Sequence, residues 1–164
     1  MFNKIKQDAQ DNPIFGTKSL VAANAAMLAT KKISEEGARS ITNNLAEIIA
    51  GVGGGDEELS RMAINLQGII GNNKVTGMDM RQFVGAGIPV WTLLEEATGK
   101  TQAELEKTNI TAEMLSDAFA KATAEGGMFY GATERAAQST KGLKAAMEDA
   151  TEMGLERLGK AIEP

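Results

Sequence analysis

Apolar residues recur along this sequence at intervals of three and four, and clusters of glycine interrupt the recurrence. Residues spaced in this way lie on one face of an α-helix, whereas a half-buried strand alternates apolar and polar residues at every second position. The clearest stripe consists of Leu59, Met62, Leu66, Ile69 and Ile70. The spacing predicts an all-α fold: a compact multi-helix domain of seven or eight short-to-medium helices joined by glycine-rich turns.

Residues that favour helix starts precede the apolar stripes. A short polar side chain before a helix can accept a hydrogen bond from a free amide of the first turn. Proline also suits this position, because the first turn does not need its missing N–H group. The predicted starts are Thr17, Ser34, Asp56, Thr76, Pro89, Thr101, Thr111 and Thr133.

The sequence divides into three segments. Residues 1–16 are polar and end at Pro13 and Gly16, which predicts a lead-in segment. Residues 17–132 carry the strong stripes and predict a helical globular module. Residues 133–164 predict a C-terminal helix that could begin an extended helical region. Its thinner stripe is formed by Leu143, Met147, Ala150 and Met153.

The bulk properties exclude several classes of protein. Hydrophobic residues make up 43% of the 164 residues, enough for a folded core. The net charge of −5 repels phosphate backbones, so we expect no sequence-specific nucleic acid binding. No apolar run approaches the roughly 18 residues of a transmembrane segment. The polar start, Met1 to Asp11, has no apolar region of the kind found in signal peptides.

The residues needed for common active sites are missing. The sequence has neither histidine nor cysteine, which excludes nucleophilic sites based on them and the usual zinc sites. Carboxylates such as Asp56 and Glu57 stand at helix starts, where they have a structural role. A phosphate-binding loop at Gly99-Lys100-Thr101 lacks its earlier glycine, because Leu94 takes that position. We expect no catalytic residue, cofactor or metal, and therefore no enzyme.

The segment from Gly85 to Leu94 is the candidate interaction site. Its apolar residues span most of the predicted helix, more than one face can bury. Trp91 could be a core residue or an interface anchor. We expect a central core helix that also takes part in self-association. The candidate protein-interaction residues are Phe83, Ile88, Pro89, Trp91 and Leu94.

Several segments together resemble the tail tape measure proteins of long-tailed bacteriophages and prophages. The most specific is Asp79-Met80-Arg81-Gln82, a helix start that is followed by the turn Ala86-Gly87-Ile88-Pro89 and an apolar helix. Weaker likenesses lie at Asn12-Pro13-Ile14-Phe15-Gly16-Thr17, Ile64-Asn65-Leu66-Gln67, Gly99-Lys100-Thr101 and Gly126-Gly127-Met128-Phe129-Tyr130-Gly131-Ala132. Their order and spacing cover about residues 10–150.

The resemblance implies a structural protein of the virion tail that passes through the host cytoplasm during assembly. Such proteins set tail length, help the tail to assemble and leave it when DNA is ejected. The implied partners are further copies, tail tube or tail-assembly proteins, and a host protein. A single helix of this whole chain would span only about 250 Å, and the resemblance implies tails that are several times longer. We therefore expect the chain to be a globular piece of a tape measure protein.

Two alternatives remain open at this point. The first is a binding module that docks a host membrane, cytosolic or defence protein. The second is an enzyme such as a peptidoglycan-cleaving domain, which some tape measure proteins carry. That enzyme would need a catalytic glutamate in a cleft, and no glutamate of this sequence has neighbouring residues typical of such a site.

Overall fold

The computed structural model describes residues 2–12 and 14–139, and every regular element within them is a helix. The all-α prediction is confirmed. A further helix begins at residue 132 and continues to residue 139. The complete helices are α1 (Phe2–Asp11), α2 (Thr17–Ala29), α3 (Glu35–Gly51), α4 (Asp56–Asn72), α5 (Gly77–Gly85), α6 (Val90–Thr98), α7 (Gln102–Glu106) and α8 (Ala112–Thr123).

The predicted threonine and serine caps start four of the complete helices. The Thr76 hydroxyl accepts a hydrogen bond from the Asp79 amide, and the Asp79 carboxylate accepts one from the Thr76 amide. Each bond satisfies an amide that the helix leaves free. Single hydroxyl caps of the same kind start α3, α7 and α8, at Ser34, Thr101 and Thr111.

Two predicted caps are displaced by one residue. The N-cap positions of α2 and α4 are Gly16 and Gly55, so Thr17 and Asp56 are the first residues inside their helices. The Asp56 carboxylate accepts a hydrogen bond from the Gly16 amide, with N and O 3.0 Å apart. Asp56 therefore fastens the start of α2 to the start of α4.

The polar lead-in segment contains a helix that the sequence did not reveal. Helix α1 packs along α2, and its Ile5 side chain is fully buried. Phe2, Ile5 and Ala9 are spaced by three and four residues, a stripe too short for an isolated helix to be expected. Docking onto α2 therefore stabilises the helix that this short stripe allows.

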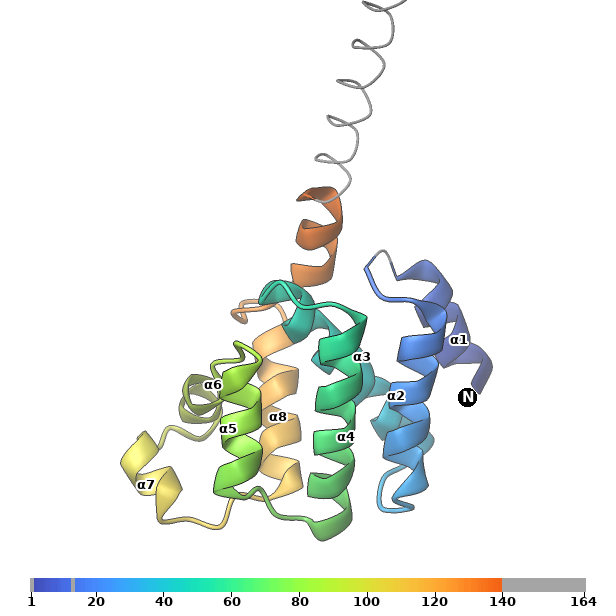
Figure 1. Cartoon of the computed structure of the whole chain (residues 1–164). Coiled ribbons are helices and arrows are strands. Elements are labelled where there is room, and N and C mark those ends of the chain that lie inside the picture. The colour runs from blue at the N-terminus through green and yellow to red at the C-terminus, as the bar shows by residue number, and fades with distance from the viewer. Residues whose placement is uncertain (1, 13, 140–164) are drawn as a thin grey trace, which may run out of the picture.

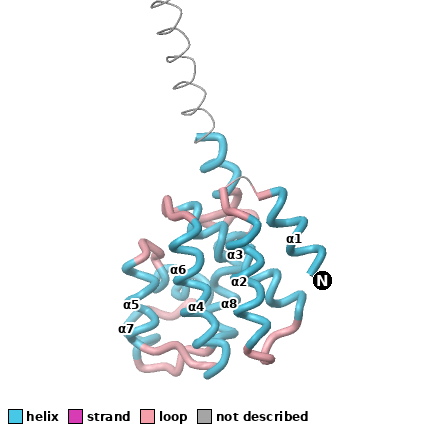
Figure 2. Tube along the Cα trace, turned by 45° about the vertical axis from the view of Figure 1, so that its right-hand side comes forward, coloured by secondary structure: helices cyan, strands magenta, loops and turns pink. Residues whose placement is uncertain are grey.

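The core lies between the long helices. Helix α2 packs on α3 and α4, while α8 packs on α3 and α6 (Figure 1). Within this core the rings of Phe83 and Phe119 meet edge to face, with centroids 5.8 Å apart. The short helices α5, α6 and α7 lie together at the edge away from α1 (Figures 1 and 2). Stripe residues that are fully or almost fully buried are Leu20, Met27, Ile41, Leu45, Ile48, Ile49, Leu59, Leu66, Ile69, Leu93 and Leu115.

Candidate functional site

The candidate interaction residues lie at two depths. The side chains of Phe83, Ile88 and Leu94 are at most 1% exposed and belong to the core. Pro89 and Trp91 are half-buried, and Trp91 packs against the core from outside. The part of this set that reaches the surface is therefore Pro89 and Trp91.

A groove of about 770 Å³ runs over Trp91 between α5 and α7. Helix α5 forms one wall, and α7 with the segment after it forms the other. The groove exists because α7 packs on α6 and leaves a gap beside α5. Its lining residues are Val75, Thr76, Gly77, Met80, Arg81, Val84, Gly85, Trp91, Leu105, Glu106, Thr108 and Ile110.

The turn after α5 sets the direction of α6 beneath the groove. Gly87 has a φ of 88°, a left-handed conformation that favours glycine. The Ile88 amide then donates to the Phe83 carbonyl at 3.0 Å, which closes the turn. Because Ile88 points into the core, the chain enters α6 with Trp91 beside Val84 at the surface.

A second hollow, of about 290 Å³, lies on the other side of Val84 and Trp91. Its remaining lining residues include Pro89 and Thr92. Val84 and Trp91 line both hollows, so they form a ridge between them, called here the Val84–Trp91 ridge. Val84 is 52% exposed, so the ridge presents an apolar side chain to solvent.

Opposite charges stand on the two walls of the groove. Arg81 belongs to α5 and Glu106 to α7, and both side chains are exposed. Glu106 accepts a hydrogen bond from the Gln102 amide group at 3.0 Å. Arg81 forms no ion pair with any other described residue. The groove therefore offers an apolar floor with one cationic and one anionic rim.

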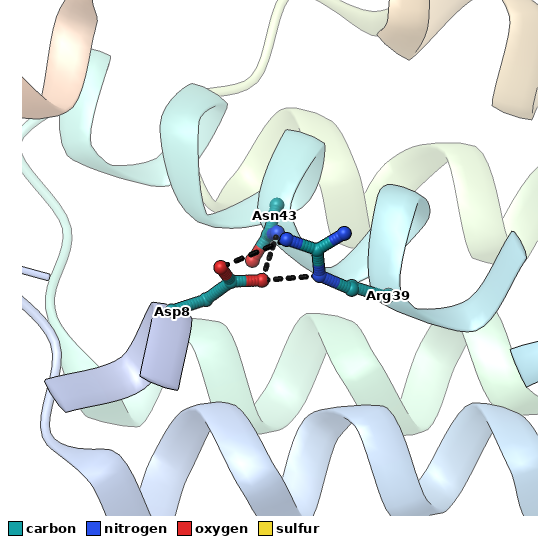
Figure 3. A network of polar contacts seen from close by, with 3 residues as sticks. All are labelled: Asp8, Arg39 and Asn43. Atoms are coloured by element: carbon teal, nitrogen blue, oxygen red, sulfur yellow. Dashed lines mark hydrogen bonds and ion pairs between the residues drawn. The ribbon is translucent and has the colours of Figure 1, made fainter. Parts of the chain in front are cut away.

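A separate polar cluster fastens both ends of the described chain to α3. The Asp8 carboxylate accepts hydrogen bonds from Arg39 Nε (2.5 Å), Arg39 Nη2 (3.0 Å) and Asn43 Nδ2 (3.0 Å), as Figure 3 shows. The hydrogen bonds from Arg39 hold the pKa of the Asp8 carboxyl below its usual value. One turn further along α3, the Glu47 carboxylate accepts a hydrogen bond from the Thr133 amide at 2.8 Å.

Sequence reasoning missed this cluster. Arg39, Asn43 and Glu47 are four residues apart and so share one face of α3, a signal that was available. Asp8 gave no signal of its own, because its segment was expected to be a lead-in without a helix.

The described residues contain no group of three or more side chains able to hold a metal ion. None of the described helices has both the length and the apolar character needed to cross a membrane.

An all-helical module with an apolar groove and an exposed apolar ridge at one edge has the features of a structural protein that works through contacts. The match to known families agrees with this class. The tape measure protein family model matches residues 3–153, and the chain belongs to that family. It is therefore a structural protein of the phage tail. Neither the curated proteins nor the solved structures gave a match.

Proposed function

We propose that this chain is a globular module of a tape measure protein that serves tail assembly through protein contacts at the Val84–Trp91 ridge. In this role it helps to set tail length and to prepare the tail for DNA passage. The supporting observation is the ridge itself, where apolar side chains stay exposed between two hollows. Partners of the ridge are other tail or tail-assembly proteins, met in the host cytoplasm while the tail is built.

The test is the substitution Val84→Ser in the phage or prophage that encodes the chain. Val84 is on the surface, so the change should leave the fold intact and remove apolar contact area. We expect fewer complete tails, or tails of altered length, in electron micrographs of lysates. The matched control is Ile64→Ser on α4, which is 66% exposed and lies outside the groove. Normal tails from Val84→Ser would contradict the proposal.

The same ridge could instead dock a host protein when DNA is injected. Its exposure on the isolated module is compatible with a partner that is met only after assembly. The stage of failure separates the two functions. If Val84→Ser particles have normal tails and adsorb to cells but fail to deliver DNA, the host-docking function is favoured.

A further inference from the structure

A polar pocket of about 530 Å³ lies where α1, the polar face of α3, the end of α8 and the helix that begins at residue 132 come together. It shares no lining residue with the groove between α5 and α7 or with the Val84–Trp91 ridge. Every lining residue except Gly131 carries a hydrogen-bonding side chain, which favours a polar ligand. The lining residues are Asp8, Asn12, Asn43, Glu47, Thr123, Tyr130, Gly131, Thr133 and Glu134.

Two glutamates of this pocket have no cationic partner within the described chain. The Asp8 carboxylate is paired with Arg39, as Figure 3 shows. Glu47 and Glu134 form no ion pair with any other described residue. The one hydrogen bond that Glu134 accepts there is long, 3.5 Å from the Gln138 side-chain amide. The pocket therefore keeps the negative charge of both glutamates, which attracts a cationic ligand.

The pocket is also lined by a buried hydroxyl that lacks a partner. The Thr133 side chain is 7% exposed, and its hydroxyl forms no hydrogen bond with any other described residue. Buried polar side chains are normally hydrogen-bonded, so an unpaired one beside a pocket points to a ligand that supplies the partner. An ammonium group donates such a bond, and the Thr133 oxygen is free to accept it.

Tyr130 adds an aromatic ring where the pocket meets solvent. Its side chain is 52% exposed, and the face of such a ring attracts a cation within about 6 Å. Arg135, which follows in the next turn of the chain, donates to the Tyr130 carbonyl and is not a lining residue. No cationic side chain of the described residues therefore lines the pocket.

We propose that this pocket binds a ligand that carries alkylammonium groups, a polyamine or the side chain of a lysine. Ammonium groups donate to Glu47, Glu134 and the Thr133 hydroxyl, and they neutralise charge that a neutral polar ligand would leave unpaired. The volume is that of a site for an organic ligand, and no three carboxylates among the described residues are placed to hold a metal ion.

The test is calorimetric titration of the whole chain with putrescine, a four-carbon diamine, from about 10 μM to about 10 mM. We expect saturable binding. Glu47→Gln and Glu134→Gln should each weaken it by about threefold or more, the effect of removing one partly exposed ion pair. Glu47→Gln keeps an oxygen for the Thr133 amide, so the fold should remain. The control Glu113→Gln removes the same charge at the opposite end of α8 from Thr123 and should leave the affinity unchanged.

The variant Thr133→Val separates binding from structure. Valine has the shape of threonine, and the hydroxyl that it replaces has no hydrogen bond to lose, so the melting temperature should stay the same or rise. The same variant should bind putrescine about threefold or more weakly, because one hydrogen bond to the ligand is lost. A purely structural role for Thr133 would not lower the affinity of a chain that is equally stable.

Further ligands define the chemistry. The diol of the same length has no charge, and Mg²⁺ has the charge without the alkyl chain. Binding of either one as tightly as putrescine would overturn the proposal. No saturation by putrescine, an equal loss with Glu113→Gln, or unchanged binding in all the pocket variants would do the same.

N-acetyl-lysine amide, with a single ammonium group, distinguishes the source of the cation. Binding about threefold or more weaker than that of putrescine favours a free polyamine, which offers an ammonium group to each glutamate. Equal affinity favours a lysine side chain of another protein. The proposed function of the Val84–Trp91 ridge is independent of these results, because the pocket and the ridge have no residue in common.

Discussion

Leu66 and Leu115 sit in the middle of their stripes, and their side chains are 1% and 0% exposed. Truncating a buried leucine removes its burial free energy and leaves a cavity that the surroundings fill only in part. We expect Leu66→Ala and Leu115→Ala each to lower the free energy of unfolding by about 2–5 kcal/mol. Urea denaturation measures this, and a cost below about 0.5 kcal/mol at both positions would contradict the assigned core faces.

Trp91 has two roles that one substitution can separate. Its side chain packs on the core yet lines the groove and the second hollow. We expect Trp91→Ala to lower the free energy of unfolding by about 1–3 kcal/mol, less than for a fully buried aromatic residue, and also to weaken self-association. Val84→Ala is the control for stability, because an exposed side chain changes it by only about 0.5 kcal/mol.

Thermal melts and sedimentation of the same Trp91→Ala samples give the two readings. A lowered melting temperature in a chain that never associates would leave Trp91 a core residue alone. An unchanged melting temperature with lost association would make it an interface residue alone.

The candidate site also contains residues whose positions the sequence could not predict. Phe83, Ile88 and Leu94 were candidates because apolar residues surround that stretch of helix. Their burial depends on how α5, α6 and α8 close around them, which no local pattern encodes. Likewise Arg81 and Glu106 carry ordinary surface charges in the sequence. Only the fold brings them to opposite walls of one groove.

At the scale of the element, helices with both a cap and a stripe were predictable. Helix α3 is a clear case, since Ser34 caps it and its stripe residues Leu45, Ile48 and Ile49 are fully buried. Helix α1 was not predicted, because its stripe of Phe2, Ile5 and Ala9 is short and the segment around it is polar. Residues 140–164, where a C-terminal helical stripe was predicted, lie outside the described residues.

The docking of α1 should depend on pH through Asp8. The pKa of its carboxyl is lowered in the folded chain, so the unfolded chain binds a proton more readily. The stability contributed by the ionised carboxylate is present above the ordinary pKa of 3.8 and is lost as pH falls through the lower, folded-state value. Acidification should therefore loosen α1, and neutral pH should hold it.

The substitution Asp8→Asn provides the comparison. We expect the wild type to be more stable than Asp8→Asn at about pH 6, and the difference to shrink towards about pH 3. Hydrogen exchange of the α1 amides, measured beside urea denaturation at each pH, reports whether the change is confined to α1. A difference that does not vary with pH would show that the ion pair with Arg39 does not hold the helix.

At the scale of the whole molecule, the fold class followed from spacing alone. Stripes such as Leu59 to Ile70 can bury their apolar faces only against one another, which makes a helical bundle the natural outcome. The order in which the helices pack was not predictable. The packing of α6 on α8, for example, brings together two helices that the short α7 separates in the sequence.

The polar face of α3 has a mechanical consequence. Asp8 near one end of the described chain and Thr133 near the other are both tied to this one helix, by Arg39 and by Glu47. A tension that draws the two ends apart therefore acts on α3 at both points, and also on the buried side chains of Ile5 and Ala132. Hydrogen bonds to partly exposed side chains yield at a smaller extension than a buried apolar interface. Under load the terminal helices would be released before the central bundle, which holds most of the buried side chains.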